Sequence, residues 1–180
     1  HVHMSLVDKD GVNYFSQGKE KMASPPFSAR LRHAIGGLLE TMPASTAILA
    51  PNANSYRRLR PESFAPVEPN WGVNHRAVAV RVPMSDEKNL RFEHRVAGAD
   101  ANPYLVTAAI AAGVHHGLTN RCDPGRMIEE GEVVSLKTRI PVRWDAALDK
   151  FSRSKVLPAY FGKDYCRFFL GNRRAESAAF

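Results

Sequence analysis

The sequence predicts an α+β fold, with helices and short strands mixed along one chain. Two observations support this prediction. Long segments carry apolar residues at helical spacing, and between them lie short segments in which apolar and polar residues alternate. The 180 residues are 44% hydrophobic, enough for one sizeable core, and contain no repeat or low-complexity tract. We therefore expect one domain or part of a larger one.

Two segments near the start predict a hairpin and a helix. In SLVDKDGVNYFS (residues 5–16), the pair Asp10-Gly11 is a turn signal. In SPPFSARLRHAIGGLLETM (residues 24–42), Ser24 is the predicted helix cap and the two prolines suit a first turn. Apolar residues at helical spacing in this segment are predicted core positions: Phe27, Leu31, Ile35, Leu38 and Met42.

A second helix is predicted within ADANPYLVTAAIAAGVHHGL, with Asn102 as its cap, Pro103 at its first position and Gly117 at its end. Its many alanines predict close packing against a neighbouring element. His115 and His116 fall in its last turn, where positive charge suits the helix dipole, so we interpret them as structural.

The C-terminal segment PVRWDAALDKFSRSKVLPAYFGKDYCRFFLGNRR predicts consecutive short helices. Breaks are expected near Pro158 and Gly162. The residues of this segment form no motif to which we assign a chemical role.

Composition limits the partners and the compartment. Lys plus Arg number 25 against 18 Asp plus Glu, a formal net charge of +7 that favours an anionic partner such as phosphate, carboxylate or nucleic acid. No aromatic platform or recognition helix accompanies this charge, so we expect no nucleic-acid partner. Cys122 and Cys166 are too few for a disulfide framework, and no apolar run approaches the ~20 residues of a membrane span. We therefore expect no membrane partner and a cytoplasmic location.

Arginine is concentrated in three stretches: NSYRRLRPESFAP (54–66), WGVNHRAVAVRVP (71–83) and NLRFEHRVAG (89–98). The first is loop-like. The second alternates and predicts a strand that starts at Arg76 and carries Arg81 near its end. Arginine suits bidentate capture of carboxylates and phosphates, so these stretches are candidates for an anion site.

The third stretch, if extended, places Arg91, Glu93 and Arg95 on one face. A surface ladder that pairs with neighbouring strands is one interpretation. A lone acid among arginines also makes sense as a metal ligand that offsets their charge. At the N-terminus, the side chains of His1 and His3 would project from the same face of a strand, which suits binding of a metal or an anion. A solvent-exposed chain end or residues of a tag would show the same pattern. Together the residues favour a metal-assisted site for a phosphate-bearing ligand.

Five motifs now identify a family resemblance. HVHMSL, NSYRRL, NHRAVAVRVP, RFEHR and ANPYL occur in the order and approximate spacing of the C-terminal half of the glutamine synthetase catalytic domain. The resemblance covers residues 1–180. It implies a curved antiparallel sheet or part barrel with packed helices, strand-rich over 1–100 and helical over 101–180. It also implies a chain that starts inside a Gly-x-His-x-His segment, so we expect a truncated fragment, inactive alone, without the N-terminal β-grasp domain.

The resemblance implies ATP-dependent ligation through γ-glutamyl phosphate. Glutamate, ATP and an amine or ammonium are the implied substrates. Two or more divalent ions, Mg or Mn, are the implied cofactors. A homo-oligomeric ring is the implied assembly of the full-length protein.

Site residues follow from the resemblance position by position. His1 and Glu93 match metal ligands; His3, Ser5, Arg81, Arg91 and, less closely, Lys88 match nucleotide-contacting positions; Arg58 and Arg95 match arginines that hold the substrate carboxylates; Arg76 matches the arginine near the transferring phosphate. Arg58 and Arg76 are therefore the expected catalytic pair, and both also bind substrate.

One departure from the family pattern concerns the acceptor. Ammonium-using members carry PGYEAP after the arginine pair, whereas this sequence has PESFAP, with Phe64 in the place of the acid. The motif SFAP resembles the corresponding segment of γ-glutamylpolyamine synthetases, such as those that act on putrescine. An aromatic ring suits contact with an alkyl or cationic amine. Two alternatives stay open: an ordinary ammonium-using glutamine synthetase, and a catalytically dead relative kept as a structural protein.

Overall fold

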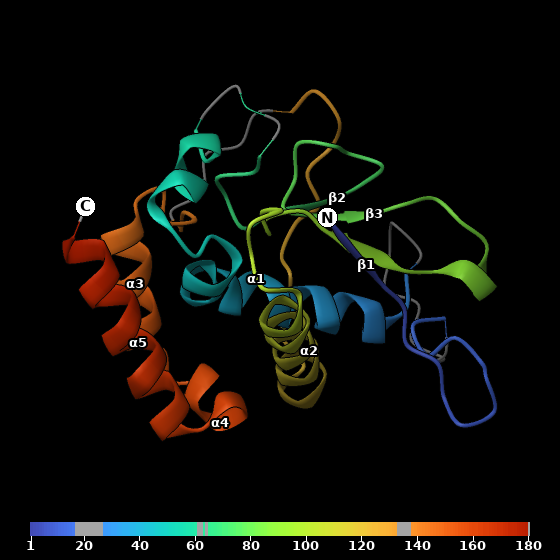
Figure 1. The fold of residues 1–180 in the computed structure, drawn as a ribbon. Helices are drawn as coiled ribbons and strands as arrows, with labels where there is room; N and C mark the ends of the chain where they lie inside the picture. Colours follow the sequence, from blue (N-terminus) through green and yellow to red (C-terminus); the bar gives the residue numbers. More distant parts are fainter. Residues whose placement is uncertain (17–26, 61–62, 64, 133–137, 180) are drawn as a thin grey trace.

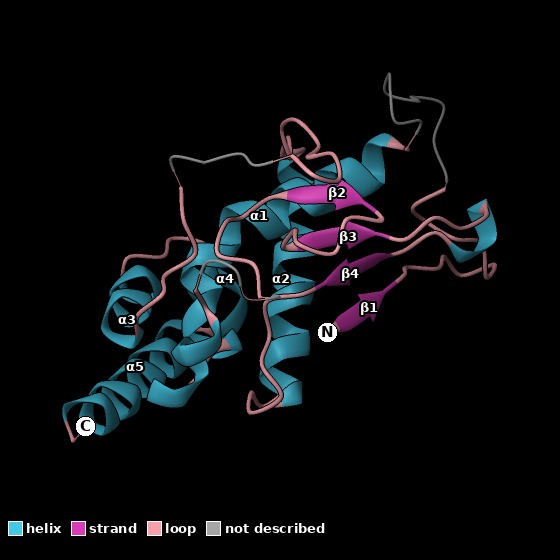
Figure 2. Ribbon diagram, turned by 90° about the horizontal axis from the view of Figure 1, so that it is seen from above, coloured by secondary structure: helices cyan, strands magenta, loops and turns pink. Residues whose placement is uncertain are grey.

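A computed structural model describes residues 1–16, 27–60, 63, 65–132 and 138–179. One small sheet is covered on one face by two long helices, and three further helices gather beyond one end of it (Figures 1 and 2). The strands are β1 (Val2–Met4), β2 (Trp71–Val73), β3 (Val80–Val82) and β4 (Phe92–His94). The helices are α1 (Ala29–Leu49), α2 (Pro103–Asn120), α3 (Trp144–Ser152), α4 (Leu157–Phe161) and α5 (Lys163–Ala178), with short 3-10 helices η1 (Ala53–Arg58) and η2 (Glu87–Asn89). The predicted α+β fold is confirmed.

The sheet has the order β1-β4-β3-β2. Two of its pairings, β1 with β4 and β4 with β3, are antiparallel as expected, but β2 and β3 run parallel. Parallel neighbours normally need a long crossover. Here residues 74–79 suffice because each strand is only three residues long.

Arg76 therefore does not begin a strand, which corrects the prediction. It lies in the turn between β2 and β3, exposed to solvent. Asn74 bends the chain in a left-handed conformation with φ of 51°, and its side chain accepts a hydrogen bond from the Met84 amide. The strand that carries Arg81 therefore begins at Val80, four residues later than predicted, because residues 74–79 turn the chain.

Residues of β4 alternate between the two faces of the sheet. Phe92 and His94 face α1 and α2, whereas Glu93 lies on the opposite face. The main core fills the space between the sheet and these two helices, and its fully buried large side chains include Phe15, Leu31, Ile35, Leu38, Met42, Trp71, Phe92 and Ile110. The predicted core stripe of α1 is therefore confirmed, with Phe27 packed at its partly buried edge.

Helix α1 begins later and ends later than the predicted segment. Ser28 caps it by accepting a hydrogen bond from the Leu31 amide. The predicted cap, Ser24, lies outside the described residues. The helix continues through Pro43 to Leu49, and Ile48 and Leu49 are buried. Burial of this last turn offsets the one backbone hydrogen bond that proline cannot make.

Helix α2 starts as predicted and ends differently. Asn102 caps it by accepting from the amides of Tyr104 and Leu105, and Pro103 takes the first helical position. Gly117 does not end the helix, which continues to Asn120 and is capped by Arg121 in a left-handed conformation. A Cβ on Gly117 would lie 2.1 Å from the His33 carbonyl oxygen, so this glycine permits the close contact of α2 with α1.

The hairpin and the C-terminal helices agree with expectation in outline. Val7 and Asn13 form an isolated antiparallel bridge around a turn in which Gly11 has φ of 76°. Helices α4 and α5 are separated at Gly162, as predicted, whereas Pro158 lies inside the first turn of α4. A second core joins these helices to the end of α1 and contains Trp144, Leu148, Phe151, Leu157 and Cys166. Among the helices of the described residues, none has the length and apolar character needed to cross a membrane.

Candidate active site on the exposed face of the sheet

A row of residues crosses the sheet on the face away from α1 and α2. The register places His3 opposite Glu93, Glu93 opposite Arg81, and Arg81 opposite Gly72. His1 stands on the same face of β1, two residues before His3. Strand alternation and register therefore bring together imidazoles, a carboxylate and a guanidinium from three different strands.

Glu93 is the centre of this row. Arg95 Nη1 donates to Glu93 Oε1 at 2.8 Å, and Arg81 Nη1 donates to Glu93 Oε2 at 3.1 Å. His1 Nδ1 lies 3.0 Å from Oε1, and His3 Nε2 lies 3.9 Å from the same oxygen. The Glu93 side chain is only 5% exposed because these cationic and polar groups cover it.

A buried carboxylate requires partners to offset the loss of water. Glu93 has two arginines and a nearby imidazole, so the charge on this face is net positive. Nε of Arg81 and Nε of Arg95 are buried donors without an acceptor among the described residues. This combination suits a site that receives further negative charge from a ligand.

Arg58 reaches the same end of β4 from η1. Its Nη2 donates to the carbonyl oxygen of Val96, next to Arg95. Burial lowers the pKa of the Arg58 guanidinium, and nearby Asp100 partly offsets that effect. Gly98 makes room for both side chains, since a Cβ there would lie 2.3 Å from Asp100 Oδ1 and 3.3 Å from Arg58 Nε and Nη2.

Asp100 fixes η1 beside β4. Ser55 Oγ donates to Asp100 Oδ2 at 2.5 Å, and Asn52 Nδ2 donates to the same oxygen at 2.9 Å. Asn52 also caps η1 by accepting from the Ser55 amide. This network was not predicted from the sequence. The pattern that could have indicated it is the group of short polar residues just before the arginine pair and just before α2.

The arginine-rich stretch separates in space. Arg57 and Arg60 do not join Arg58 but line a different pocket of about 620 Å³, together with Arg139 and Lys150. Only Arg58 points toward β4. Spacing along the sequence does not distinguish these three arginines, because which side they face depends on how η1 is held.

The other predicted site residues are exposed or half-buried. Ser5 follows β1 and is exposed, Lys88 is exposed on η2, and Arg91 is half-buried with its Nη1 donating to the Asn89 carbonyl oxygen. Arg76 lies in the exposed turn after β2. Phe64 and Glu62, on which the acceptor argument depends, lie outside the described residues.

His1 and Glu93 fit a divalent metal. An imidazole nitrogen and a carboxylate oxygen 3.0 Å apart, with the imidazole 45% exposed, are donors that such ions accept together with water or phosphate oxygens. Within the described part of the chain these two residues do not form a closed ligand set, since a group of three metal-type donors occurs only elsewhere.

The sheet, its covering helices and the row of carboxylate, imidazole and guanidinium groups form a site whose side chains suit a metal ion and an anionic ligand. The sequence profile of the glutamine synthetase catalytic domain matches residues 1–180, and the chain belongs to that family. Enzymes of this family use ATP and divalent metal ions.

Relatives within the family are named for the synthesis of different γ-glutamyl amides. Over 180 residues the chain is 39% identical to gamma-glutamylputrescine synthetase PuuA of Escherichia coli and 32% identical to gamma-glutamylethanolamide synthetase GlnA4 of Streptomyces coelicolor. Each of these two matches covers 100% of this chain and 37% of the relative. It is 35% identical to glutamine synthetase of Sulfolobus acidocaldarius over 189 residues, covering 98% of this chain and 40% of that one.

Solved structures agree with this assignment. Two structures of GmaS, one without ligand and one with ADP, superpose with TM-scores of 0.83 and 0.84 at 28% and 29% identity. Each match covers 98% of this chain and 40% or 41% of the GmaS chain. The chain therefore spans about two fifths of the length of the proteins it matches.

Proposed function

We propose that the full-length protein is an ATP-dependent ligase that joins glutamate to an alkyl amine through γ-glutamyl phosphate. The observation that carries the proposal is the buried Glu93 carboxylate between Arg81 and Arg95, with His1 at 3.0 Å, on the face of a glutamine synthetase-type sheet. A carboxylate becomes a good electrophile only after phosphorylation. The reaction therefore needs positive charge where phosphate and carboxylate meet.

The residues of this chain divide that task by position. Arg58 and Arg95, at the same end of β4, hold the carboxylates of glutamate. Arg81, in the middle of the row, and Arg91, at its rim, bind the nucleotide together with His3, Ser5 and Lys88.

Arg76 and the metal ligands complete the arrangement. Arg76, in a solvent-exposed turn, contacts the transferring phosphate. His1 and Glu93 hold a divalent ion, which when bound stabilises negative charge on the phosphate oxygens. The Glu93 carboxylate limits repulsion between Arg81 and Arg95 before the substrates arrive.

The acceptor is proposed from Phe64. An aromatic side chain in the place of the family's acid removes the group that attracts and deprotonates ammonium, while each buried methylene of a longer amine contributes about 0.8 kcal/mol. The 39% identity to a gamma-glutamylputrescine synthetase supports an amine acceptor, with a diamine such as putrescine as the first choice. The similarity to a glutamine synthetase keeps ammonium as the second candidate.

A phosphate-release assay separates the two acceptors. With glutamate and ATP fixed, the full-length protein should show a specificity constant roughly a hundredfold higher for a primary alkyl amine than for ammonium, since about three or four buried methylenes supply that factor. Phe64→Glu should shift the ratio toward ammonium, and Phe64→Tyr is the matched control that keeps the ring. If ammonium is the best acceptor of the panel, the protein is an ordinary glutamine synthetase. If no acceptor releases phosphate while ATP still binds, it is a structural relative.

A further inference from the structure

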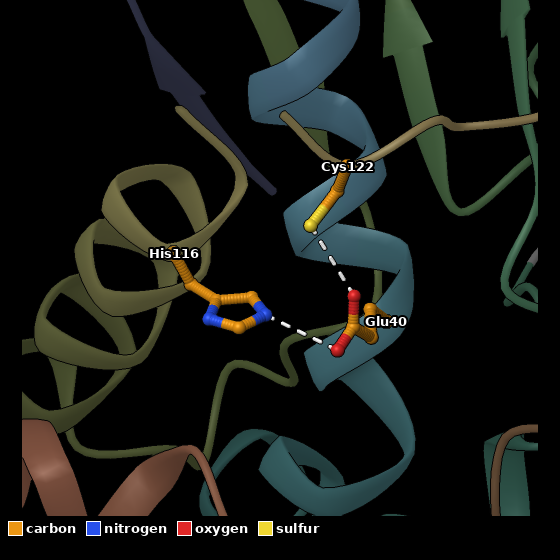
Figure 3. A group of neighbouring side chains, drawn as sticks. All are labelled: Glu40, His116 and Cys122. Atoms are coloured by element: carbon orange, nitrogen blue, oxygen red, sulfur yellow. Dashed lines mark hydrogen bonds and ion pairs between the residues drawn. The ribbon is translucent and has the colours of Figure 1, made fainter. Parts of the chain in front are cut away.

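A second group of ligand-type side chains lies away from the sheet, between α1 and the end of α2. Figure 3 shows Glu40 on α1, His116 on α2 and Cys122 just after α2, with their side chains pointing toward one another. His116 Nε2 lies 3.1 Å from Glu40 Oε1, and the Cys122 thiol donates to Glu40 Oε2 at 3.2 Å. One ligand atom from each of the three residues falls within 4.8 Å of the other two.

We propose that Glu40, His116 and Cys122 form a binding site for a zinc-class divalent cation, separate from the metal site at His1 and Glu93. Nitrogen, sulfur and oxygen donors together suit a borderline-soft ion rather than Mg²⁺, which prefers oxygen alone. With metal–ligand distances of about 2.0–2.3 Å, tetrahedral geometry puts ligand atoms roughly 3.3–3.8 Å apart. His116 Nε2 is already close to that spacing from Glu40 Oε1, and Cys122 Sγ is close to it from Glu40 Oε2, so a small rotation of the carboxylate brings one oxygen to both donors.

The charges balance in the bound state. Glu40 supplies one negative charge, Cys122 supplies a second when it loses its proton to solvent on binding, and neutral His116 supplies none. Two negative charges match one divalent cation. Three protein ligands leave a fourth position for water, which agrees with the location of Glu40 at the surface, where its side chain is 55% exposed.

The backbone holds Cys122 in place before any ion binds. Arg121, in the left-handed conformation, reverses the chain at the end of α2, and the Cys122 amide donates to the Gly117 carbonyl oxygen. The Cys122 carbonyl oxygen lies 3.0 Å from His33 Nδ1 and packs directly over Gly36, where a Cβ would lie only 2.5 Å away. The thiol is therefore positioned over α1 by contacts that do not involve the thiol itself.

His116 is also positioned by a neighbour. Asn120 Nδ2 lies 3.1 Å from His116 Nδ1 and donates to the His116 carbonyl oxygen at 2.9 Å. The ring is held with Nε2 toward Glu40. When Nε2 binds a cation the ring proton moves to Nδ1, and a rotated Asn120 amide can accept it, an arrangement common behind metal-bound histidines.

Cobalt(II) tests the site because it replaces zinc and reports on sulfur. Titrating the full-length, reduced protein with Co²⁺ in the presence of Mg²⁺ should produce a thiolate-to-cobalt charge-transfer band, which the sheet site lacks a thiol to produce. Cys122→Ser should abolish the band, and Cys166→Ser is the matched control that should retain it. Glu40→Gln and His116→Gln should weaken Zn²⁺ affinity at least ~10–100-fold, the range that loss of a supporting group already costs.

His115→Gln is the control for His116→Gln, because His115 bonds to Tyr160 instead. Zn²⁺ should also raise the melting temperature of the parent protein and of the His115 variant, but not that of the Cys122 or His116 variants. These outcomes do not depend on the acceptor or on ligase activity. A band that is absent from the parent, that survives Cys122→Ser or that disappears in Cys166→Ser would show that the three residues form hydrogen bonds only.

Discussion

Glu93 and Arg81 face each other across β4 and β3, and Arg81 Nη1 donates to Glu93 Oε2 at 3.1 Å. Arg95 occupies the other carboxylate oxygen at 2.8 Å. In the folded chain, the Glu93 carboxylate limits repulsion between the two arginines. In the proposed reaction, it also acts with neighbouring His1 as a metal ligand.

Replacement of Glu93 by Gln tests both functions. The amide keeps the shape of the side chain but loses its charge. The metal concentration that gives half-maximal ADP formation by the full-length protein should therefore rise at least ~10-fold. The melting temperature should fall as well, because buried arginines lose their carboxylate. Glu87→Gln on exposed η2 is the control and should change neither. Unchanged metal dependence together with a lower melting temperature would make Glu93 a structural residue only.

Arg58→Lys should impair glutamate binding. Lysine has no planar fork, so it cannot both contact the Val96 carbonyl oxygen and hold a carboxylate. Loss of hydrogen bonds to a charged group, about 1.5–3 kcal/mol, corresponds to a rise in KM for glutamate of roughly 10–100-fold. Steady-state kinetics with ATP saturating measures it. Arg57→Lys, which alters the separate pocket, should leave this KM unchanged, and an equal effect of both variants would contradict the assignment.

His94 should make the stability depend on pH. Burial lowers the pKa of His94 to about 4. The unfolded chain takes up this proton near pH 6.5 and the folded chain does not, so stability is fully present above about pH 6.5 and decreases below it. Between pH 7 and pH 5 the loss should be about 2 kcal/mol, measured by urea unfolding. His94→Leu should remove this dependence, and an identical pH slope in the variant would contradict it.

Gly117→Ala should destabilise the contact between α1 and α2. The added methyl would meet the His33 carbonyl oxygen at 2.1 Å and the Gly37 nitrogen at 2.8 Å, so one helix must move. Overpacking of this kind costs about 1–3 kcal/mol. Gly171→Ala is the matched control, because it also lies inside a helix but has nothing within 4 Å. The control should be neutral or more stable by up to about 1 kcal/mol, and equal melting temperatures for the two variants would contradict the close contact.

Local patterns predicted much of this chain correctly. Asn102-Pro103 predicts the start of α2, the alternation of β4 places Glu93 and Arg95 on one face, and Gly162 separates α4 from α5. Each of these features depends on residues within one turn or one strand. Such signals are complete in a short stretch of sequence.

The wrong predictions share a different cause. Gly117 is predicted to end a helix because glycine is common at that position. In the structure it lies inside α2 and allows close contact with α1 at Gly37, 80 positions earlier in the sequence. Arg76 is predicted to begin a strand because the alternating pattern extends back into the turn that starts at Asn74, and that turn depends on an unusual backbone conformation. In both cases a distant or unusual backbone contact outweighed the local preference.

What the sequence determined by itself is therefore the set of elements, the family and the chemical types at the site. The family resemblance selects Arg58 from the pair Arg57-Arg58, but the physical cause of its orientation toward β4 is tertiary: the bonds of Asp100 to Asn52 and Ser55 hold η1 in place. Tertiary structure alone brought Glu40 together with His116 and Cys122, 76 and 82 positions further along the chain. The physical reason is that periodicity and caps are local free-energy preferences, whereas a site depends on which distant surfaces pack together, and no single stretch of sequence encodes that choice.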